Sequence, residues 1–401
     1  MRLCCGVRTV YLDYNATTPL DAAVREAMTP ALEGAFGNPS SVHHVGQRAR
    51  RMLDESRERV ADVFGCKPSE VLFTSGATES VNLAVLGAAR SLRAKGRHIV
   101  SSEMEHAAVL EACEYLAKNE GFSLSLVAPD SSGLISVDSV AAALRPDTIL
   151  VSIVGANNEV GTIQPVSEIG ALCSQRGICF HVDAAQWLGK LPFSSIHQFH
   201  ADLVSFCAHK FHGPKGAGGL FVRSPLQISP ILYGGSHEYE RRAGTENLPA
   251  ILGLAKAVDL FVRDPVFNPA LLSPMADHLL RLVDSIPATT FRGHRTARLP
   301  NTVSFTVAGA DSISLLAGLD LEGICASSGS ACSSGSITPS RVVSAMGASL
   351  EESHSLVRFS IGRENAPSDI DTVHNSLPHI IARALSAHKV WTGVSTSVHG
   401  P

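Results

Sequence analysis

The sequence predicts an α/β protein whose mostly parallel sheet is covered by helices on both faces. Short apolar segments alternate with longer stretches of helical periodicity, which is the order typical of βαβ units. The expected strands are apolar throughout and span residues 71–73, 99–101, 124–127, 149–154, 178–182 and 203–206. Because such strands bury both faces, they belong in a parallel sheet. Ligands bind at the carboxyl ends of parallel strands, so we expect the chemistry in the loops that follow these segments.

Two domains are expected. An amphipathic helix over residues 46–64, ended by Gly65, precedes the strands, and a helix at about 254–261 follows them. Residues 263–272 are irregular and hold two prolines, which suggests a boundary between a large domain (11–262) and a smaller α+β domain (263–388). The smaller domain is expected to contain a helix near 275–285, a strand at 302–307, another helix, a Ser/Gly-rich loop at 326–336, a strand at 356–361 and a helix at 368–385. The tail, 389–401, is expected to be loosely ordered.

Composition excludes several classes of protein. The chain has 401 residues, of which 45% are hydrophobic and 17% charged, as in ordinary globular proteins. Its formal net charge of −4 gives no basic field for nucleic acid, and no apolar run reaches the ~18–20 residues that span a membrane. The nine cysteines form no CxxC pair, and no HExxH motif occurs, so neither a metal site nor a disulfide framework is supported. Without an export signal, the chain is expected in the reducing cytoplasm.

Three strand ends carry residues that can take part in chemistry. Lys210 follows the strand at 203–206, where desolvation can lower the pKa of an amine and make it nucleophilic. Asp183 follows the strand at 178–182, where a carboxylate can pair with a protonated pyridine nitrogen. Residues 74–80 run from a strand into a helix whose first amides suit a phosphate. Each feature also has an ordinary explanation: an exposed lysine before a Gly/Pro turn, a helix-capping aspartate and a common helix start.

The Ser/Gly-rich loop at 326–336 surrounds Cys332. Small polar residues leave little surface to bury, so a cysteine in this loop is exposed and its thiolate is available as a nucleophile. On composition alone, a flexible linker with an incidental cysteine explains the loop equally well.

Taken together, these motifs resemble the NifS/IscS-type cysteine desulfurases, which belong to the class V aminotransferase group of fold-type I pyridoxal-phosphate enzymes. The matching segments are residues 14–19, 37–41, 74–79, 105–106, 157–161, 183–186, 209–210, 242–247, 327–336 and 358–360. They run in family order over nearly the whole chain and are very specific as a set. The resemblance implies a fold-type I transferase with a large cofactor-binding domain and a smaller α+β domain that carries the cysteine loop.

The resemblance also implies roles around the cofactor ring. Lys210 is implied to bind pyridoxal phosphate covalently and to move protons, and Asp183 to pair with the ring nitrogen. Gln186 is implied to donate to the phenolic oxygen of the ring. Asn158 is implied to contact the polar edge of the cofactor or substrate, and His106 to stack on the ring and assist proton transfer.

A second set of positions matches those that contact the cofactor phosphate: Ala77, Thr78, Cys207, His209 and Thr245. The counterpart of Thr245 reaches the cofactor of the other subunit, which implies a homodimer. Cys207 departs from the family, in which a serine is usual. Because a thiol is a weaker donor, we expect either a lower phosphate affinity or compensation by a neighbouring group.

Two positions are implied to carry the sulfur chemistry. Cys332 is implied to take the sulfur of L-cysteine as a persulfide, leaving L-alanine, and to pass it to an acceptor protein, either an iron–sulfur scaffold or another carrier. Arg358 is implied to bind the substrate carboxylate, a task that suits a bidentate guanidinium. A surface arginine is the alternative.

Three other functions are open at this point. A lyase of the selenocysteine or cysteine-sulfinate type shares nearly all of these residues, although the small-residue loop around Cys332 favours a desulfurase. A non-catalytic relative would have lost Lys210, Asp183 or Cys332, and all three are present. An aminotransferase would need no cysteine in the loop. The acceptor also stays open, because the carboxyl tail does not match the docking tail of the IscS branch.

Overall fold

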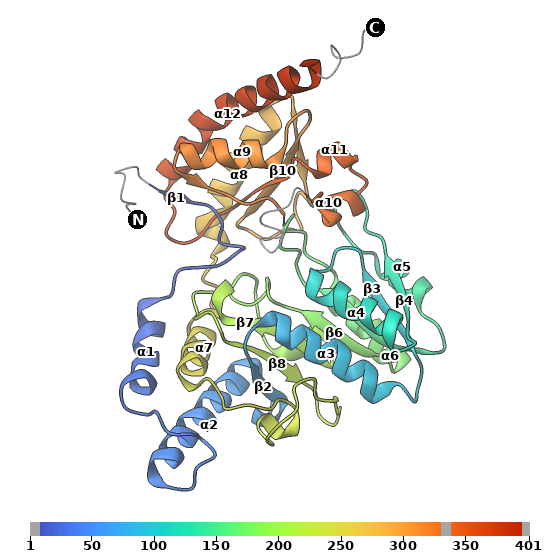
Figure 1. Ribbon diagram of the computed structural model, residues 1–401, viewed down its shortest axis with the longest axis vertical. Helices are drawn as coiled ribbons and strands as arrows, with labels where there is room; N and C mark the ends of the chain where they lie inside the picture. The colour runs from blue at the N-terminus through green and yellow to red at the C-terminus, as the bar shows by residue number, and fades with distance from the viewer. Residues whose placement is uncertain (1–8, 330–337, 395–401) are drawn as a thin grey trace.

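The computed structural model describes residues 9–329 and 338–394, which pack around two main sheets (Figure 1). The larger sheet has seven strands in the order β2-β8-β7-β6-β5-β3-β4, and only β8 among them runs antiparallel to the rest. Its strands are β2 (Val71–Thr74), β3 (His98–Ser102), β4 (Ser123–Val127), β5 (Thr148–Val154), β6 (Cys179–Asp183), β7 (Leu203–Cys207) and β8 (Gly218–Val222). The predicted mostly parallel sheet is therefore confirmed, and the six predicted strands lie within one residue of their expected ends.

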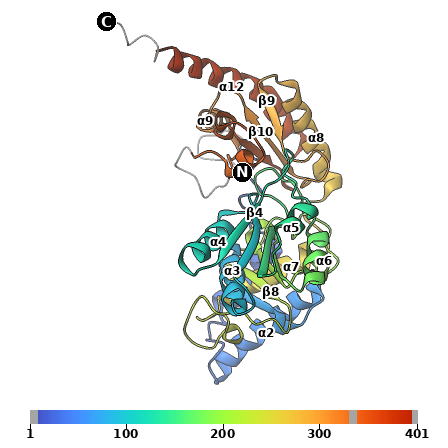
Figure 2. The same cartoon turned by 90° about the vertical axis from the view of Figure 1, so that its right-hand side faces the viewer.

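Helices cover both faces of this sheet (Figure 2). One face packs against α3 (Ala77–Leu92) and α4 (Ala107–Asn119). The other packs against α1 (Ala22–Glu33), α2 (His44–Phe64), α5 (Val137–Ala143), α6 (Val166–Arg176) and α7 (Leu248–Phe261). Side chains alternate along each strand, so Leu203 of β7 joins the first core and Val204 the second. None of the helices in the described ranges is long and apolar enough to cross a membrane.

The second body is built on an antiparallel sheet in the order β12-β10-β9. Its strands are β9 (Thr289–Arg292), β10 (Thr302–Val307) and β12 (Val357–Ser360), and its helices are α8 (Pro269–Ser285), α9 (Ser312–Leu321), α10 (Arg341–Ala345), α11 (Leu350–Ser353) and α12 (Pro367–Val394). The amino-terminal strand β1 (Val10–Tyr11) pairs with β11 (Ile324–Cys325), and Val10, Leu12 and Tyr14 pack in the core of this body. The division of the chain at residue 263 stays a prediction, but residues 10–14 pack with the carboxyl-terminal part.

Several elements differ from the expectation, each for a local reason. Strand β8 was not predicted, because Gly218 and Gly219 give it no apolar pattern; a side chain at Gly219 would stand 2.3 Å from the Phe206 ring. Helix α8 begins at Pro269, inside the segment expected to be irregular, because Asn268 caps it and a proline suits the first helical position. Helix α12 continues to Val394 and so enters the tail expected to be loosely ordered.

Candidate functional site

The residues predicted to hold the cofactor gather at one edge of the large sheet. Strands β2, β3, β5, β6 and β7 run parallel, so their carboxyl ends meet there. The ends of these strands and the segments that follow them carry the predicted residues: Ala77 and Thr78 (at the start of α3, after β2), His106 (after β3), Asn158 (after β5), Asp183 and Gln186 (at and after the end of β6), and Cys207, His209 and Lys210 (at and after the end of β7). These residues therefore lie at the carboxyl edge of the sheet, where the sequence predicts the chemistry.

Lys210 ends a short 3-10 helix (Ala208–Lys210) directly after β7. Its Nζ donates to the backbone carbonyl oxygens of Asn15 at 2.6 Å and Ala16 at 2.8 Å. Burial lowers the pKa of this amine, and no carboxylate in the described ranges forms an ion pair with it. A desolvated amine without a salt bridge spends more time neutral, which is the nucleophilic form.

Asp183 and His106 lie within electrostatic reach of Lys210 and of each other. Asp183 is 4% exposed, and its Oδ1 accepts a hydrogen bond from the amide of Ala185 at 3.0 Å. Burial raises the pKa of this carboxyl, while the charges of His106 and Lys210 act in the opposite direction. Residues 185–190 form turns rather than a helix, so Asp183 caps no helix. A buried carboxylate that depends on nearby positive charge suits a protonated ring nitrogen.

His106 caps α4, and this contact fixes its ring. Its Nδ1 accepts a hydrogen bond from the amide of Ala108 at 3.1 Å. Burial, together with the charge of Lys210, lowers the pKa of His106, while Asp183 acts against this change. The ring is therefore neutral near pH 7 and carries its proton on Nε2, the nitrogen that is left for another partner.

The start of α3 is built to receive an anion. Its first residue follows Gly76, which has no side chain to cap the helix. The amide of Ala77 contacts the thiol of Cys207, and the helix dipole makes this end of the helix electropositive. A Cβ on Gly218 would lie 2.6 Å from the Cα of Gly76, so glycine at 218 is required for this close approach. The 16-residue helix thus offers an amide cradle that fits a phosphate.

Cys207 and His209 line the same edge as uncharged groups. The Cys207 thiol is fully buried next to the amide of Ala77, and burial raises its pKa to about 11. The ring of His209 lies 3.2 Å from the hydroxyl of Thr17, and burial lowers its pKa to about 4. Both groups are neutral near pH 7, so a phosphate here would rely on the helix amides. These amides are the neighbouring groups that can compensate for the missing serine.

Arg358 lies on β12 of the second body and reaches the same site. It is 1% exposed, so the surface alternative is wrong. Its Nη2 forms an ion pair with Asp13 at 2.7 Å, and its Nη1 donates to the carbonyl oxygens of Asn158 at 2.8 Å and Gly329 at 3.1 Å. Among the described residues, none accepts from its buried Nε. An N–H without a partner on a fixed guanidinium suits a carboxylate ligand.

Two predicted site residues remain outside this description of the cluster. Cys332 lies outside the described residues, so its position relative to Lys210 stays a prediction. Thr245 is exposed in the segment before α7. The predicted contact of Thr245 with the cofactor of a second subunit stays a prediction.

Three residues of the site carry no strong signal in the sequence. Asp13 holds Arg358, and the backbone oxygen of Asn15 holds Lys210. Lys190 is fully buried beside them. Asn15 belongs to the 14–19 motif, but the motif does not indicate that the backbone oxygen of Asn15 binds Lys210. Lys190 gives no sequence signal, because lysines are mostly exposed.

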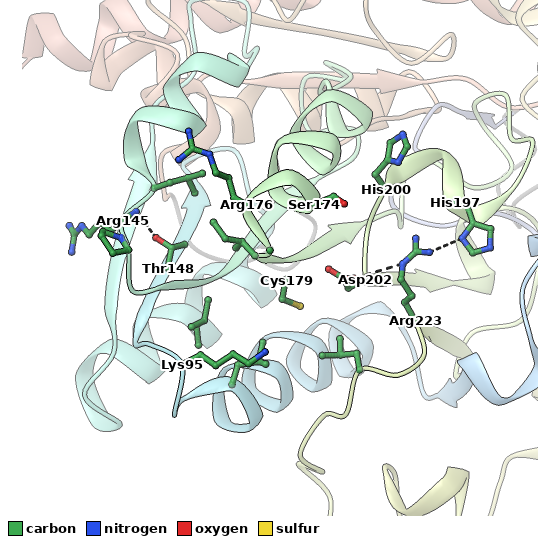
Figure 3. A pocket seen from close by; sticks show the side chains of 17 residues that line it. Lys95, Arg145, Thr148, Ser174, Arg176, Cys179, His197, His200, Asp202 and Arg223 are labelled. Carbon is green, nitrogen blue, oxygen red and sulfur yellow. Dashed lines mark hydrogen bonds and ion pairs between the residues drawn. The ribbon is translucent and has the colours of Figure 1, made fainter.

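A cavity of about 890 Å³ lies at the opposite edge of the same sheet (Figure 3). It is lined by the first residues of β5 and β6, Thr148 and Cys179, and by Lys95, Arg176 and Arg223. Arg176 is the last residue of α6, where a positive charge stabilises the helix dipole, and Lys95 lies three residues after the end of α3. We therefore explain these cations structurally and place the chemistry at the Lys210 edge.

Comparison with known proteins gives a consistent result. Residues 10–373 match the model of the class V aminotransferases. The chain is 43% identical over 385 residues to the cysteine desulfurase IscS of Dictyoglomus turgidum, covering 95% of this chain and 97% of the relative. It is 42% identical over 376 residues to the cysteine desulfurase IscS of Methanosarcina thermophila, covering 94% and 93%. A solved NifS-like protein aligns with a TM-score of 0.86 at 34% identity, covering 94% of this chain and 100% of the other.

Proposed function

This chain belongs to the class V aminotransferase family and is a NifS/IscS-type cysteine desulfurase that uses pyridoxal phosphate, and from that premise we propose the roles of its site residues. Lys210 holds the cofactor, Asp183 pairs with its ring nitrogen, and the start of α3 binds its phosphate. When bound, the cofactor withdraws electrons from the substrate carbons. The observation that carries the proposal is the convergence of a buried amine, a buried carboxylate and an uncapped helix start at one sheet edge.

Other residues orient and move protons around this centre. Neutral His106 stacks on the ring and exchanges a proton through Nε2. Gln186 donates to the phenolic oxygen, and Asn158 contacts the polar edge of the cofactor or substrate. Around the phosphate, Ala77 and Thr78 supply donors, with Cys207 and His209 as uncharged neighbours and Thr245 reaching from the second subunit.

Arg358 and Cys332 act on the substrate, L-cysteine. Arg358 binds the carboxylate, supported by its ion pair with Asp13. The thiolate of Cys332 forms an S–S bond with the substrate sulfur as the bond between that sulfur and the β-carbon breaks. The electron pair of the broken bond stays on the carbon, which takes a proton delivered through Lys210 and leaves as L-alanine. The sulfur remains on Cys332 as a persulfide for an acceptor protein.

The enzyme is a cytoplasmic homodimer that hands sulfur to an iron–sulfur scaffold or another carrier. The cytoplasm is supported by the six free thiols of the described residues, since such thiols persist in a reducing compartment. The dimer is supported by large exposed apolar side chains between α1 and α2, among them Phe36 and Val42. The acceptor is inferred from the desulfurase activity, because the persulfide sulfur must be transferred to another molecule before the next turnover.

Two variants test the proposed roles separately. In Lys210→Ala we expect no visible absorbance from lysine-bound cofactor. In Cys332→Ala we expect the absorbance to stay while release of sulfide from L-cysteine and formation of labelled protein persulfide are lost. Cys325→Ala is the matched control, because Cys325 is a free, partly exposed cysteine on the strand that precedes the loop. Full sulfide release by Cys332→Ala would contradict the persulfide role, and an unchanged spectrum in Lys210→Ala would contradict the cofactor assignment.

A further inference from the structure

Lys190 is a second buried lysine next to the proposed cofactor lysine. Its side chain is fully buried, at 0% exposure. Lysines are almost never fully buried unless they are paired. No carboxylate in the described part of the chain forms an ion pair with Lys190. Burial and the charge of Lys210 both lower its pKa. A side chain placed at this cost requires a specific reason.

The contacts of Lys190 are amide oxygens and an aromatic ring. Its Nζ donates to Oδ1 of Asn15 at 2.5 Å and to Oε1 of Gln186 at 2.7 Å. The same nitrogen lies 4.6 Å from the centre of the Phe267 ring. Both amide contacts need only N–H donors, which a lysine offers whether it is charged or neutral. The geometry therefore does not depend on its charge state.

These contacts connect Lys190 to Lys210 through two residues. Gln186 accepts from Lys190 with Oε1 and donates with Nε2 to the backbone oxygen of Asn15 at 2.9 Å. That same oxygen accepts from Nζ of Lys210 at 2.6 Å. The side chain of Asn15 is also held by Asn301 and Thr302. Lys190 is thus the donor at the buried end of a hydrogen-bond network that ends on the cofactor lysine.

The direction of this network decides which end of Gln186 faces the site. A glutamine amide can be turned over, which exchanges its oxygen and its NH₂ group. A neighbouring lysine can only donate hydrogen bonds, so it favours the orientation in which the glutamine oxygen faces the lysine. With Oε1 on Lys190 and one N–H of Nε2 on Asn15, the second N–H of Gln186 is left to donate elsewhere.

We propose that Lys190 is a positioning residue, which orients the Gln186 amide so that its free N–H donates to the phenolic oxygen of pyridoxal phosphate. The inference rests on the proposed roles of Gln186 and Lys210. Lys190 acts through Gln186 and Asn15 and does not itself touch the cofactor or substrate.

A double-mutant cycle tests this inference. Cofactor-free wild type, Lys190→Met, Gln186→Met and the double variant are titrated with pyridoxal phosphate, and the visible band of the lysine-bound cofactor is recorded. We expect each single variant to bind about 10-fold more weakly, which is about 1.4 kcal/mol and the size of one lost hydrogen bond. We expect the visible band to move in the same direction in both. The double variant should bind no more than about 3-fold more weakly than either single variant, because both remove one interaction.

Lys256→Met is the matched control, because Lys256 is a lysine on α7 that pairs with Asp259 near the surface. It should bind the cofactor like wild type. An unchanged affinity in Lys190→Met, or an additive loss of about 100-fold in the double variant, would overturn the inference. If Lys190→Met does not fold, as judged by circular dichroism, Lys190→Gln replaces it in the same cycle and is read by the same criteria. Failure of the proposed function would appear instead as a lysine-bound band that persists in Lys210→Ala.

Discussion

At the scale of single residues, burial sets the protonation of the site. Burial lowers the pKa values of His106 and His209, and it raises the pKa of the Cys207 thiol to about 11. These groups are therefore neutral near pH 7, and Asp183 is left as the buried acidic group facing Lys210. Burial also lowers the pKa of Lys210 and raises that of Asp183, and the positive charge of Lys210 opposes the change at Asp183.

His181 extends the same pattern beneath the site. Its ring is fully buried on β6, with Nδ1 2.8 Å from the hydroxyl of Ser152 and Nε2 2.8 Å from that of Ser205. Burial lowers its pKa from 6.5 to about 3. Between these values the unfolded chain binds more protons than the folded chain, so stability rises with pH and is lost as the pH falls through this window.

His181→Asn tests this dependence. Free energies of unfolding in urea are measured at pH 7, 6 and 5 for the cofactor-free protein. The variant is expected to be less stable at pH 7, since it breaks a buried network, but its stability should fall less steeply with acid. The difference in slope should approach about 1.4 kcal/mol per pH unit for one group. His44→Asn, at an exposed position of α2, should keep the wild-type slope. Equal slopes in wild type and His181→Asn would contradict the prediction.

At the scale of elements, the proposed phosphate site depends on how closely β8 approaches the start of α3. Gly76 and Gly218 make the backbones of the two segments meet. The antiparallel strand β8, between β2 and β7, therefore helps to position the first amides of α3 opposite Cys207. A side chain between the two glycines would displace the amides from the phosphate.

Gly218→Ala is expected to weaken both folding and cofactor binding. The added Cβ would stand 2.6 Å from the Cα of Gly76, and such overpacking costs about 1–3 kcal/mol. Thermal unfolding of the cofactor-free protein and titration with pyridoxal phosphate measure the two effects. Gly34→Ala is the matched control, because a Cβ there meets nothing within 4 Å. Wild-type affinity in Gly218→Ala would show that the approach of β8 does not set the phosphate site.

A buried ion pair between Arg57 and Glu238 holds the loop before the 242–247 motif. Glu238 accepts from Arg57 of α2 at 2.6 and 2.7 Å and from the amide of Phe73 at 2.9 Å, and it is buried. Three successive residues here, Glu238, Tyr239 and Glu240, have positive φ angles of 46°, 58° and 64°. A strained turn of this kind persists only where surrounding contacts enforce it. The buried ion pair thus fixes the loop that precedes Thr245.

At the scale of the whole molecule, the exposed apolar residues indicate where a second copy would bind. Leu32, Phe36 and Val42 are 65%, 83% and 88% exposed, and they lie close together in sequence at the end of α1 and before α2. Monomeric proteins seldom expose clustered large apolar side chains. Figure 1 places α1 and α2 at one side of the large body, away from the second body. This surface is consistent with the proposed homodimer.

Phe36→Glu is expected to convert the dimer to a monomer, because a charge at the centre of an apolar interface is costly to bury. Light scattering coupled to size-exclusion chromatography should give about twice the chain mass of 42.3 kDa for wild type and one chain mass for the variant. Leu321→Glu changes a residue that is 80% exposed on α9 of the second body and should stay dimeric. A monomeric wild type, or a dimeric Phe36→Glu, would contradict the proposed interface.

The fold is accessible from the sequence where the signal is local. Apolar strands and the polar residues at their ends are read from a few consecutive positions, which is why the sequence predicts the six parallel strands and places Lys210 and Asp183 at strand ends. Strand β8 was missed because its glycines are explained only by Phe206 and Gly76, which lie on other segments. The start of α8 differs from the expectation because a proline can either interrupt a helix or begin one, and only the cap at Asn268 decides between the two.

What the sequence determined by itself is the order of the chemistry: an uncapped helix start, a carboxylate and a lysine, each after a parallel strand. What only the tertiary structure decided is how these groups are held. Asn15 is far from Gln186 and Lys210 in the chain, yet its backbone oxygen accepts hydrogen bonds from both side chains, and Lys190 donates to the Gln186 amide. Periodicity assigns a side chain to a face, but a buried donor finds its acceptor only when the packed core brings distant segments within about 3 Å.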